Sequence, residues 1–251
     1  MESYASAAQV YAAGMIFARI GAMVMLIPAI GENPVPPRIR LAFGVLLALM
    51  LFPVVGGQMT VVPPTMAGLV GGLIKEVLTG LMIGTILRMF ISSLAVAGEV
   101  LSLQTTLSFS QTANPAQAAP STSLGTFLGM MGIVLIMTTD LHHLFISAMV
   151  RSYSLFPVVK ALNTGDAAQL AIQTAGKSFA LGLQLAAPVV VFSLVFNIAT
   201  GLVGRVMPQF QVFFVATPLI VLFGLSIFAL SLGVIGTVWV NRYRELLGVF
   251  G

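Results

Sequence analysis

Six long apolar runs dominate this sequence and leave few options for its fold. They cover about residues 10–30, 39–55, 66–98, 124–150, 179–203 and 210–240. A membrane-spanning helix needs about 20 apolar residues, so each run is long enough, or nearly so, to cross a bilayer. Inside lipid such runs form helices, because the backbone has no other way to satisfy its amides. We therefore predict an all-α, polytopic, membrane-associated protein with about six long apolar helices, several of them broken or kinked.

The composition supports a membrane environment. Of the 251 residues, 58% are hydrophobic and only 7% are charged, whereas about a quarter of the residues in a soluble domain are charged. The net charge of +4 comes from scattered residues, so no nucleic-acid partner is expected. Glu2 precedes the first run and Arg19 lies inside it, so we expect this run to be retained rather than cleaved as a signal peptide.

The sequence offers no catalytic or cofactor-binding constellation. There is no cysteine, which excludes disulfides and thiolate metal sites. No HExxH motif, P-loop or glycine-rich strand–helix turn is present. We predict that the protein is not an enzyme and needs no metal or cofactor.

The third run, residues 66–98, is too long and too charged for a simple span. As one helix it would extend about 50 Å, against about 30 Å for the hydrocarbon core. Charges at mid-span are costly unless they are paired or face protein or water. The helix is therefore either broken or partly inside a protein assembly. The charged residues that we expect to be buried and satisfied are Lys75, Glu76 and Arg88 in this run and Glu99 just after it.

A polar stretch with no charge beyond Glu99 separates the third and fourth runs. It is rich in Ser, Thr, Gln and Ala, and it contains Asn114-Pro115 and Pro120. Small uncharged groups could fill a narrow water-lined passage without burying an ion, and proline discourages regular helix. A flexible connecting loop explains the same composition equally well.

The fourth run contains Asp140, His142 and His143. Their spacing does not place all three side chains on one helical face. A metal site would need ligands from elsewhere, so we interpret these residues as a helix terminus or an interface.

The last two runs are interpreted as a helical hairpin that turns at residues 205–209. Pro188 and Pro218 interrupt its two arms, and each proline frees a backbone carbonyl and bends its helix. Asn197 is a polar residue in an apolar arm, where an amide can bond across helices.

The turn and its flanks resemble the FliR/SctT family of type III export-gate proteins. The residues that carry this likeness are Asn197, Gly201, Arg205, Pro208 and Gln209, with Gln211-Val212-Phe213 and Pro218 beyond them. Upstream, the proline-rich connection before Arg38 and Arg40, the Gly98-Glu99 pair and Gln104 also fit the family. Asn114-Pro115 stands where many members have Asp-Pro. The resemblance covers essentially the whole chain.

The resemblance implies a subunit of the flagellar type III protein export channel. This channel lies in the bacterial inner membrane, at the centre of the flagellar basal body. The implied partners are FliP and FliQ in one helical assembly, FlhB and FlhA beside it, and exported flagellar proteins in transit. Residues 1–165 would be a FliP-like four-helix region, and residues 166–251 a FliQ-like hairpin.

In this family, the uncharged stretch corresponds to a loop at about residues 106–123 that plugs the closed channel. The plug residues expected here are Phe109, Ser110, Gln111, Asn114, Pro115, Gln117 and Pro120. At the hairpin turn, Arg205 and Gln209 are expected either to contact a partner or to cap the helix end. The alternative is a secondary transporter of a small solute, with Lys75, Glu76, Arg88 and Glu99 as its transport site. We find no inverted repeats of the kind that such transporters show.

Overall fold

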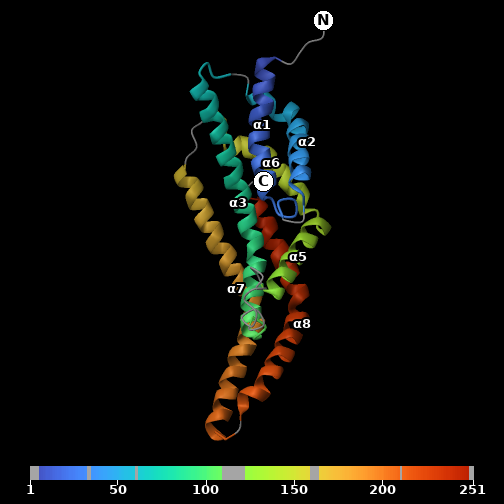
Figure 1. Cartoon of the computed structure of the whole chain (residues 1–251), viewed down its shortest axis with the longest axis vertical. Helices are drawn as coiled ribbons and strands as arrows, with labels where there is room; N and C mark the ends of the chain where they lie inside the picture. The colour runs from blue at the N-terminus through green and yellow to red at the C-terminus, as the bar shows by residue number, and fades with distance from the viewer. Residues whose placement is uncertain are drawn as a thin grey trace. The chain divides into compact units, whose positions relative to one another are not determined.

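The computed structural model describes residues 6–32, 35–59, 62–108, 122–158, 164–209 and 211–248. In these ranges the chain is helical and forms no strand. The helices are α1 (Ala7–Leu26), α2 (Pro37–Val55), the short 3₁₀ helix η1 (Gly56–Gln58), α3 (Met66–Gln104), α5 (Ser123–Thr138), α6 (Leu141–Leu155), α7 (Thr164–Val206) and α8 (Val212–Gly248) (Figure 1). The all-α prediction is confirmed.

Five of the described helices are long and apolar enough to cross a membrane, and α5 with α6 makes a sixth if this bent pair is one span. The predicted set of about six long helices is therefore confirmed. Helix α3 runs unbroken for 39 residues, which corresponds to about 58 Å. Of the two alternatives for the third run, the broken helix is wrong. Proline does not break the hairpin arms either, since α7 and α8 continue through Pro188 and Pro218.

The fourth apolar run is broken at Thr139 and Asp140, where α5 and α6 meet at a bend of 78°. Asp140 adopts φ 58° and ψ 18°, a left-handed conformation that Asp tolerates better than most residues. The Thr139 hydroxyl donates to the Leu135 carbonyl at 2.7 Å and thus occupies a carbonyl at the end of α5. The interpretation of Asp140 as a helix terminus is right.

Contacts divide the chain into two compact units. The first comprises Met1–Phe90, Asp140–Ala175 and Arg244–Gly251. In it, α1 packs against α2 and against the first half of α3 (Figure 1). A Cβ added at Gly80 would lie 2.3 Å from the Arg19 carbonyl oxygen, and one at Gly84 would lie 2.8 Å from the Leu26 Cβ. These glycines therefore allow α1 and α3 to approach closely, as GxxxG pairs do.

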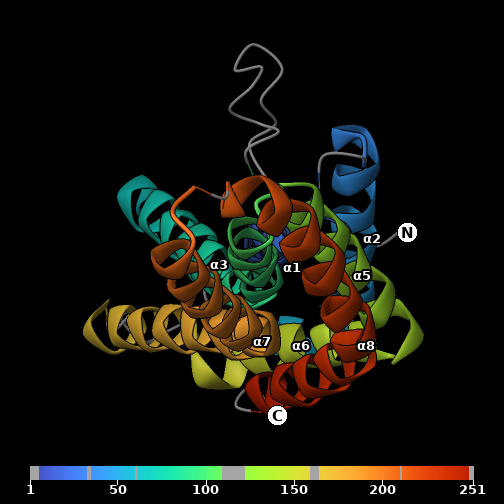
Figure 2. The same cartoon turned by 90° about the horizontal axis from the view of Figure 1, so that it is seen from below.

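The second unit comprises Ile91–Thr139 and Gly176–Tyr243. Helix α7 approaches α3 at Gly182, where an added Cβ would lie 2.8 Å from the Ser93 carbonyl oxygen. Helix α8 reaches the same place, because the Trp239 Nε1 donates to the Ser93 Oγ at 3.2 Å. Figure 2 shows α5 beside α8. The Phe127 ring of α5 and the Phe228 ring of α8 pack edge to face. The division of the chain at residues 165 and 166 stays a prediction.

Candidate functional site

A fully buried ion pair joins α1 to α3. The Arg19 Nε donates to the Glu76 Oε2 at 2.6 Å, and the Arg19 Nη2 donates to the Glu76 Oε1 at 2.9 Å. Both side chains are 0% exposed. This bidentate geometry is the strongest form of such a pair, and it gives Glu76 a partner away from lipid.

The other Arg19 donors hold the end of α6. Nη1 donates to the Ser152 carbonyl at 2.9 Å, and Nη2 donates to the Phe156 carbonyl at 2.8 Å. The guanidinium carbon also lies 4.1 Å from the centre of the Tyr153 ring, within the range of a cation–π contact. A cation at a helix C-terminus complements the helix dipole. Arg19 thus fastens three helices, α1, α3 and α6, at one point.

Lys75 forms hydrogen bonds with the chain just beyond the C-terminal end of α6. Its Nζ donates to the carbonyls of Pro157 at 3.0 Å and Val158 at 2.5 Å. Lys75 and Glu76 are sequence neighbours, yet each meets a different element, because consecutive residues point about 100° apart on a helix. We call Arg19 and Glu76, with the Ser152 and Phe156 carbonyls that Arg19 binds, the buried charged cluster.

Arg88 and Arg40 lie near the connection that follows α1. The Arg88 Nη2 is 3.9 Å from the Glu32 Oε2, and the Arg88 side chain is 47% exposed. Arg88 is therefore not buried by this chain itself. Arg40 donates to the carbonyls of Val35 at 2.9 Å and Glu32 at 2.7 Å. The arginine after the proline-rich connection thus holds that connection against the start of α2.

Glu99, the fourth predicted charge, meets the start of α5. Its Oε1 accepts a hydrogen bond from the Thr122 backbone amide at 2.8 Å. Thr122 is the N-cap of α5, and its hydroxyl accepts from the Gly125 amide at 3.1 Å, which is the ordinary capping bond. Along α3, Glu99 lies 23 positions after Glu76, which corresponds to about 35 Å. These charges therefore do not converge on one site.

The predicted plug residues, from Phe109 to Pro120, lie outside the described residues. The described chain reaches Ser108 on one side of them and resumes at Thr122 on the other. Thr106 adopts φ 61°, an unusual conformation for a β-branched residue.

The residues of the hairpin turn are exposed in this chain. Arg205 lies in the last turn of α7, and Gly201, Pro208 and Gln209 are also exposed. A Cβ added at Gly201 would meet no atom within 4 Å.

Asn197, in α7 before the turn, reaches a buried group. Its Nδ2 donates to the Ser193 Oγ at 3.4 Å, and this hydroxyl donates to the Gln104 Oε1 at 2.6 Å. Two polar positions of the resemblance, Asn197 and Gln104, are thus linked through Ser193. The sequence reasoning had not singled out Ser193.

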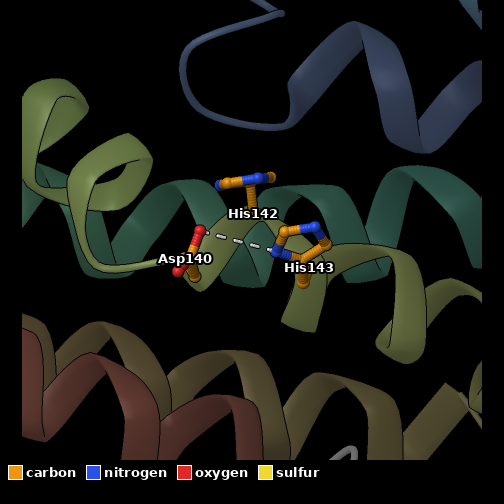
Figure 3. Close-up of side chains that lie close together, drawn as sticks. All are labelled: Asp140, His142 and His143. Atoms are coloured by element: carbon orange, nitrogen blue, oxygen red, sulfur yellow. Dashed lines mark ion pairs between the residues drawn. The ribbon is translucent and has the colours of Figure 1, made fainter.

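Asp140, His142 and His143 come close together at the bend between α5 and α6 (Figure 3). One possible ligand atom from each lies within 4.8 Å of the others. The pair of Asp140 and His143 is mostly exposed, with an Oδ1–Nδ1 distance of 3.7 Å. Among the residues that the structure describes, no fourth His, Cys, Asp or Glu joins them. The arrangement is what a solvated i, i+3 pair at a helix start gives.

Large apolar side chains remain exposed on several helices. Those that are at least about half exposed on α2, α7 and α8 include Leu46, Leu49, Met50, Val54, Val191, Leu194, Val195, Ile198, Leu202, Phe214, Leu222, Leu230 and Val234. Exposed apolar side chains in such number mark contact with lipid or with other proteins.

Arg19 is the functional candidate that the sequence analysis missed. It is a lone charge in the middle of an apolar run, and that position alone signals a paired or interior side chain. Its partners come from residues 76 and 152–156, so no local pattern could have connected them.

Comparison with known proteins gives a consistent result. A model of the family described as bacterial export proteins, family 1, matches residues 10–246. The chain is 58% identical to the flagellar biosynthetic protein FliR of Caulobacter vibrioides over 250 residues, which cover 100% of both chains. It is 28% identical to FliR of Bacillus subtilis, over 94% of this chain and 95% of the relative. It is 27% identical to FliR of Escherichia coli K12, over 92% of this chain and 88% of the relative.

Proposed function

Because this chain belongs to family 1 of the bacterial export proteins, with a FliR relative that matches it from end to end, we propose that it is a subunit of the flagellar protein export gate and forms part of its protein-conducting channel. The observation that carries this proposal is the 58% identity to a flagellar FliR over 100% of both chains. The family is one of flagellar export proteins and not of enzymes.

The proposed partners are FliP and FliQ in one helical assembly, with FlhB and FlhA beside it. The first region, residues 1–165, would take a FliP-like place, and residues 166–251 a FliQ-like place. The exposed apolar faces on α2, α7 and α8 support this proposal, because they give neighbouring helices a large apolar surface to cover. The proposed location is the inner membrane, at the centre of the flagellar basal body.

The uncharged stretch at about residues 106–123 is the proposed plug of the closed channel. Two points support this role besides the family resemblance. Its composition lets it enter a narrow lumen without burying an ion, and its C-terminal end at Thr122 is held by Glu99. The exposed turn residues, Arg205 and Gln209 among them, are proposed to contact a partner of the core assembly.

Solute transport is less well supported than protein export. A transport site would need the charges of α3 to converge around one solute. Instead, each carboxylate oxygen of Glu76 accepts a hydrogen bond from Arg19, and the Lys75 ammonium donates to two backbone carbonyls. Glu99 lies about 35 Å further along the helix.

The proposal is tested by shortening the plug in the assembled gate. Deletion of residues 112–117 should leave the complex intact and let small ions cross the membrane in the closed state. The readouts are co-purification of the subunits, ion leak across the membrane, and export of flagellar proteins. A shortened variant that assembles, exports and stays tight to ions would refute the plug role and leave a simple connecting loop.

A further inference from the structure

The Glu99 carboxylate lies over the first turn of α5. Its Oε1 is 2.8 Å from the Thr122 amide nitrogen and 2.9 Å from the point that a Cβ on Gly125 would occupy. The free amides at the start of a helix carry partial positive charge, so an anion is favourable there. A hydrogen bond to a carboxylate is also stronger than one between neutral groups. Glu99 is therefore suited to hold α5 by its N-terminus.

The backbones of α3 and α5 touch beside this bond. A Cβ added at Gly98 would lie 2.3 Å from the Gly125 Cα and 2.4 Å from the Gly125 nitrogen. Any side chain at Gly98 would push α5 away from α3 and lengthen the hydrogen bond at Glu99. The adjacent Gly98-Glu99 pair thus combines a close approach with an anchoring group.

The other end of the uncharged stretch leaves α3 close to the same place. Gln104 at the end of α3 is bonded to Ser193 of α7, and the Thr105 side chain packs against Gly224 of α8. The chain then turns at Thr106, and the Ser108 amide donates back to the Ser102 carbonyl at 3.2 Å. Thr105 follows the last residue of α3 and lies six positions after Glu99, which corresponds to about 9 Å along the helix. Both ends of the stretch are thus held on one short part of α3.

We propose that Glu99 is a positioning residue of the export gate, which anchors the first turn of α5 on α3 and so fixes where the uncharged stretch rejoins the bundle. This inference rests on the proposed function. If the stretch plugs the closed channel as proposed above, loss of this anchor at Thr122 should raise the leak of ions through the closed gate.

Two substitutions at Thr122 separate the contribution of its backbone amide from that of its side-chain hydroxyl. Thr122→Ala removes the capping hydroxyl and keeps the amide that Glu99 binds. Thr122→Pro removes both, and its fixed φ of about −65° suits this position, where φ is −68° and ψ is 160°. The chain already begins α2 after such a proline, Pro36, with φ −58° and ψ 141°. The difference between the two variants therefore reports on the bond to Glu99.

The experiment measures ion leak through the assembled, closed gate. Glu99→Ala and Thr122→Pro should each raise the leak about tenfold, the factor expected when a hydrogen bond to a charged group is lost. Glu99→Gln keeps an acceptor oxygen without the charge, so its leak should fall between Glu99→Ala and wild type. Thr122→Ala should raise the leak less than Thr122→Pro. Thr138→Ala is the matched control on α5, because its hydroxyl bonds only to carbonyls of its own helix.

The outcomes distinguish this inference from the plug itself. If deletion of residues 112–117 leaks but Glu99→Ala and Thr122→Pro stay as tight as wild type, Glu99 has no positioning role and the plug stands. If none of the three leaks, both proposals are wrong. If Glu99→Ala leaks and the deletion does not, Glu99 does not act through this stretch, which overturns the inference. Should Glu99→Ala fail to assemble, Thr122→Pro decides, and a tight Thr122→Pro gate contradicts the inference.

Discussion

The buried charged cluster and the α7–α8 hairpin differ in how far this chain itself covers their side chains. In the cluster, Arg19 and Glu76 are 0% exposed, and the chain itself supplies their partners from α1, α3 and the end of α6. On the hairpin arms, large apolar side chains point outward with more than half of their surface exposed, as for Leu194 and Leu222. The Thr200 and Ser226 hydroxyls on this hairpin donate to carbonyls of their own helices.

This difference indicates which part of the molecule is complete in a single chain. The cluster needs nothing from outside, because each of its charges already has a partner inside one unit. The hairpin arms have no such closure within the described residues, and lipid or other subunits must cover them. Substitutions in the cluster should therefore act on the stability of the chain, whereas substitutions on the hairpin should act on assembly and export.

The largest effect on stability should come from breaking the buried ion pair. Arg19→Met removes the cation and leaves Glu76 buried without a partner, which should cost about 3–5 kcal/mol of unfolding free energy. The measurement is denaturant unfolding of the purified complex. The double variant Arg19→Met with Glu76→Leu should lose clearly less, because no unpaired charge then stays buried. Equal losses of unfolding free energy in the single and the double variant would show that the unpaired Glu76 charge is not the cause of the destabilisation.

A smaller loss should follow from closing the gap between α1 and α3. Gly80→Ala places a methyl group 2.3 Å from the Arg19 carbonyl oxygen, and the backbone shift should cost about 1–3 kcal/mol. Gly71→Ala on the same helix is the control, since its Cβ would meet nothing within 4 Å. If the two alanine variants unfold at the same denaturant concentration, the close approach at Gly80 is not required.

The comparison also shows what the sequence could and could not predict. The apolar runs predicted the helices because burial in a membrane requires long apolar stretches, whichever residues those stretches contact in the folded protein. They did not locate the start of α7 at Thr164, since residues 164–178 are too polar to count as an apolar run. The apolar run 124–150 did not show the bend at Asp140 either, because hydropathy does not report a local φ of 58°.

Within the site, the sequence indicated which residues need partners but not which partners they have. Lys75 and Glu76 stood out as charges in an apolar run. Their partners, residues 19, 157 and 158, are distant in the sequence. The bond from Thr122 to Glu99 also crosses 23 residues. Such pairings depend on how the helices pack, which a single sequence does not encode in its spacing.

Loss of the Lys75 cation should lower the free energy of unfolding less than loss of Arg19. Lys75→Met keeps a side chain of similar length and removes the hydrogen bonds to the carbonyls of Pro157 and Val158. Because Lys75 is only partly buried, water can replace part of the interaction, and the expected loss is about 1–2 kcal/mol. Lys177→Met, on an exposed lysine, should leave the unfolding midpoint unchanged. A Lys75 variant that matches this control would show that Lys75 does not secure the end of α6.

The smallest effect on stability belongs to the hairpin turn. Arg205→Ala removes an exposed cation from the last turn of α7, which should cost at most about 1 kcal/mol. If the turn contacts a partner, the same variant should still form the core complex but lose flagellar protein export, measured by secretion and motility. Normal export by Arg205→Ala would show that Arg205 only complements the helix dipole.

The dependence of this chain on partner subunits is tested most directly by purifying it alone and with FliP- and FliQ-like subunits. The molecular mass and thermal unfolding midpoint are measured in the same mild detergent. The exposed apolar faces of α2, α7 and α8 predict one defined hetero-oligomer that contains this chain and unfolds at a higher temperature than the chain alone. A monodisperse, fully folded monomer that neither binds these subunits nor gains stability from them would contradict the account.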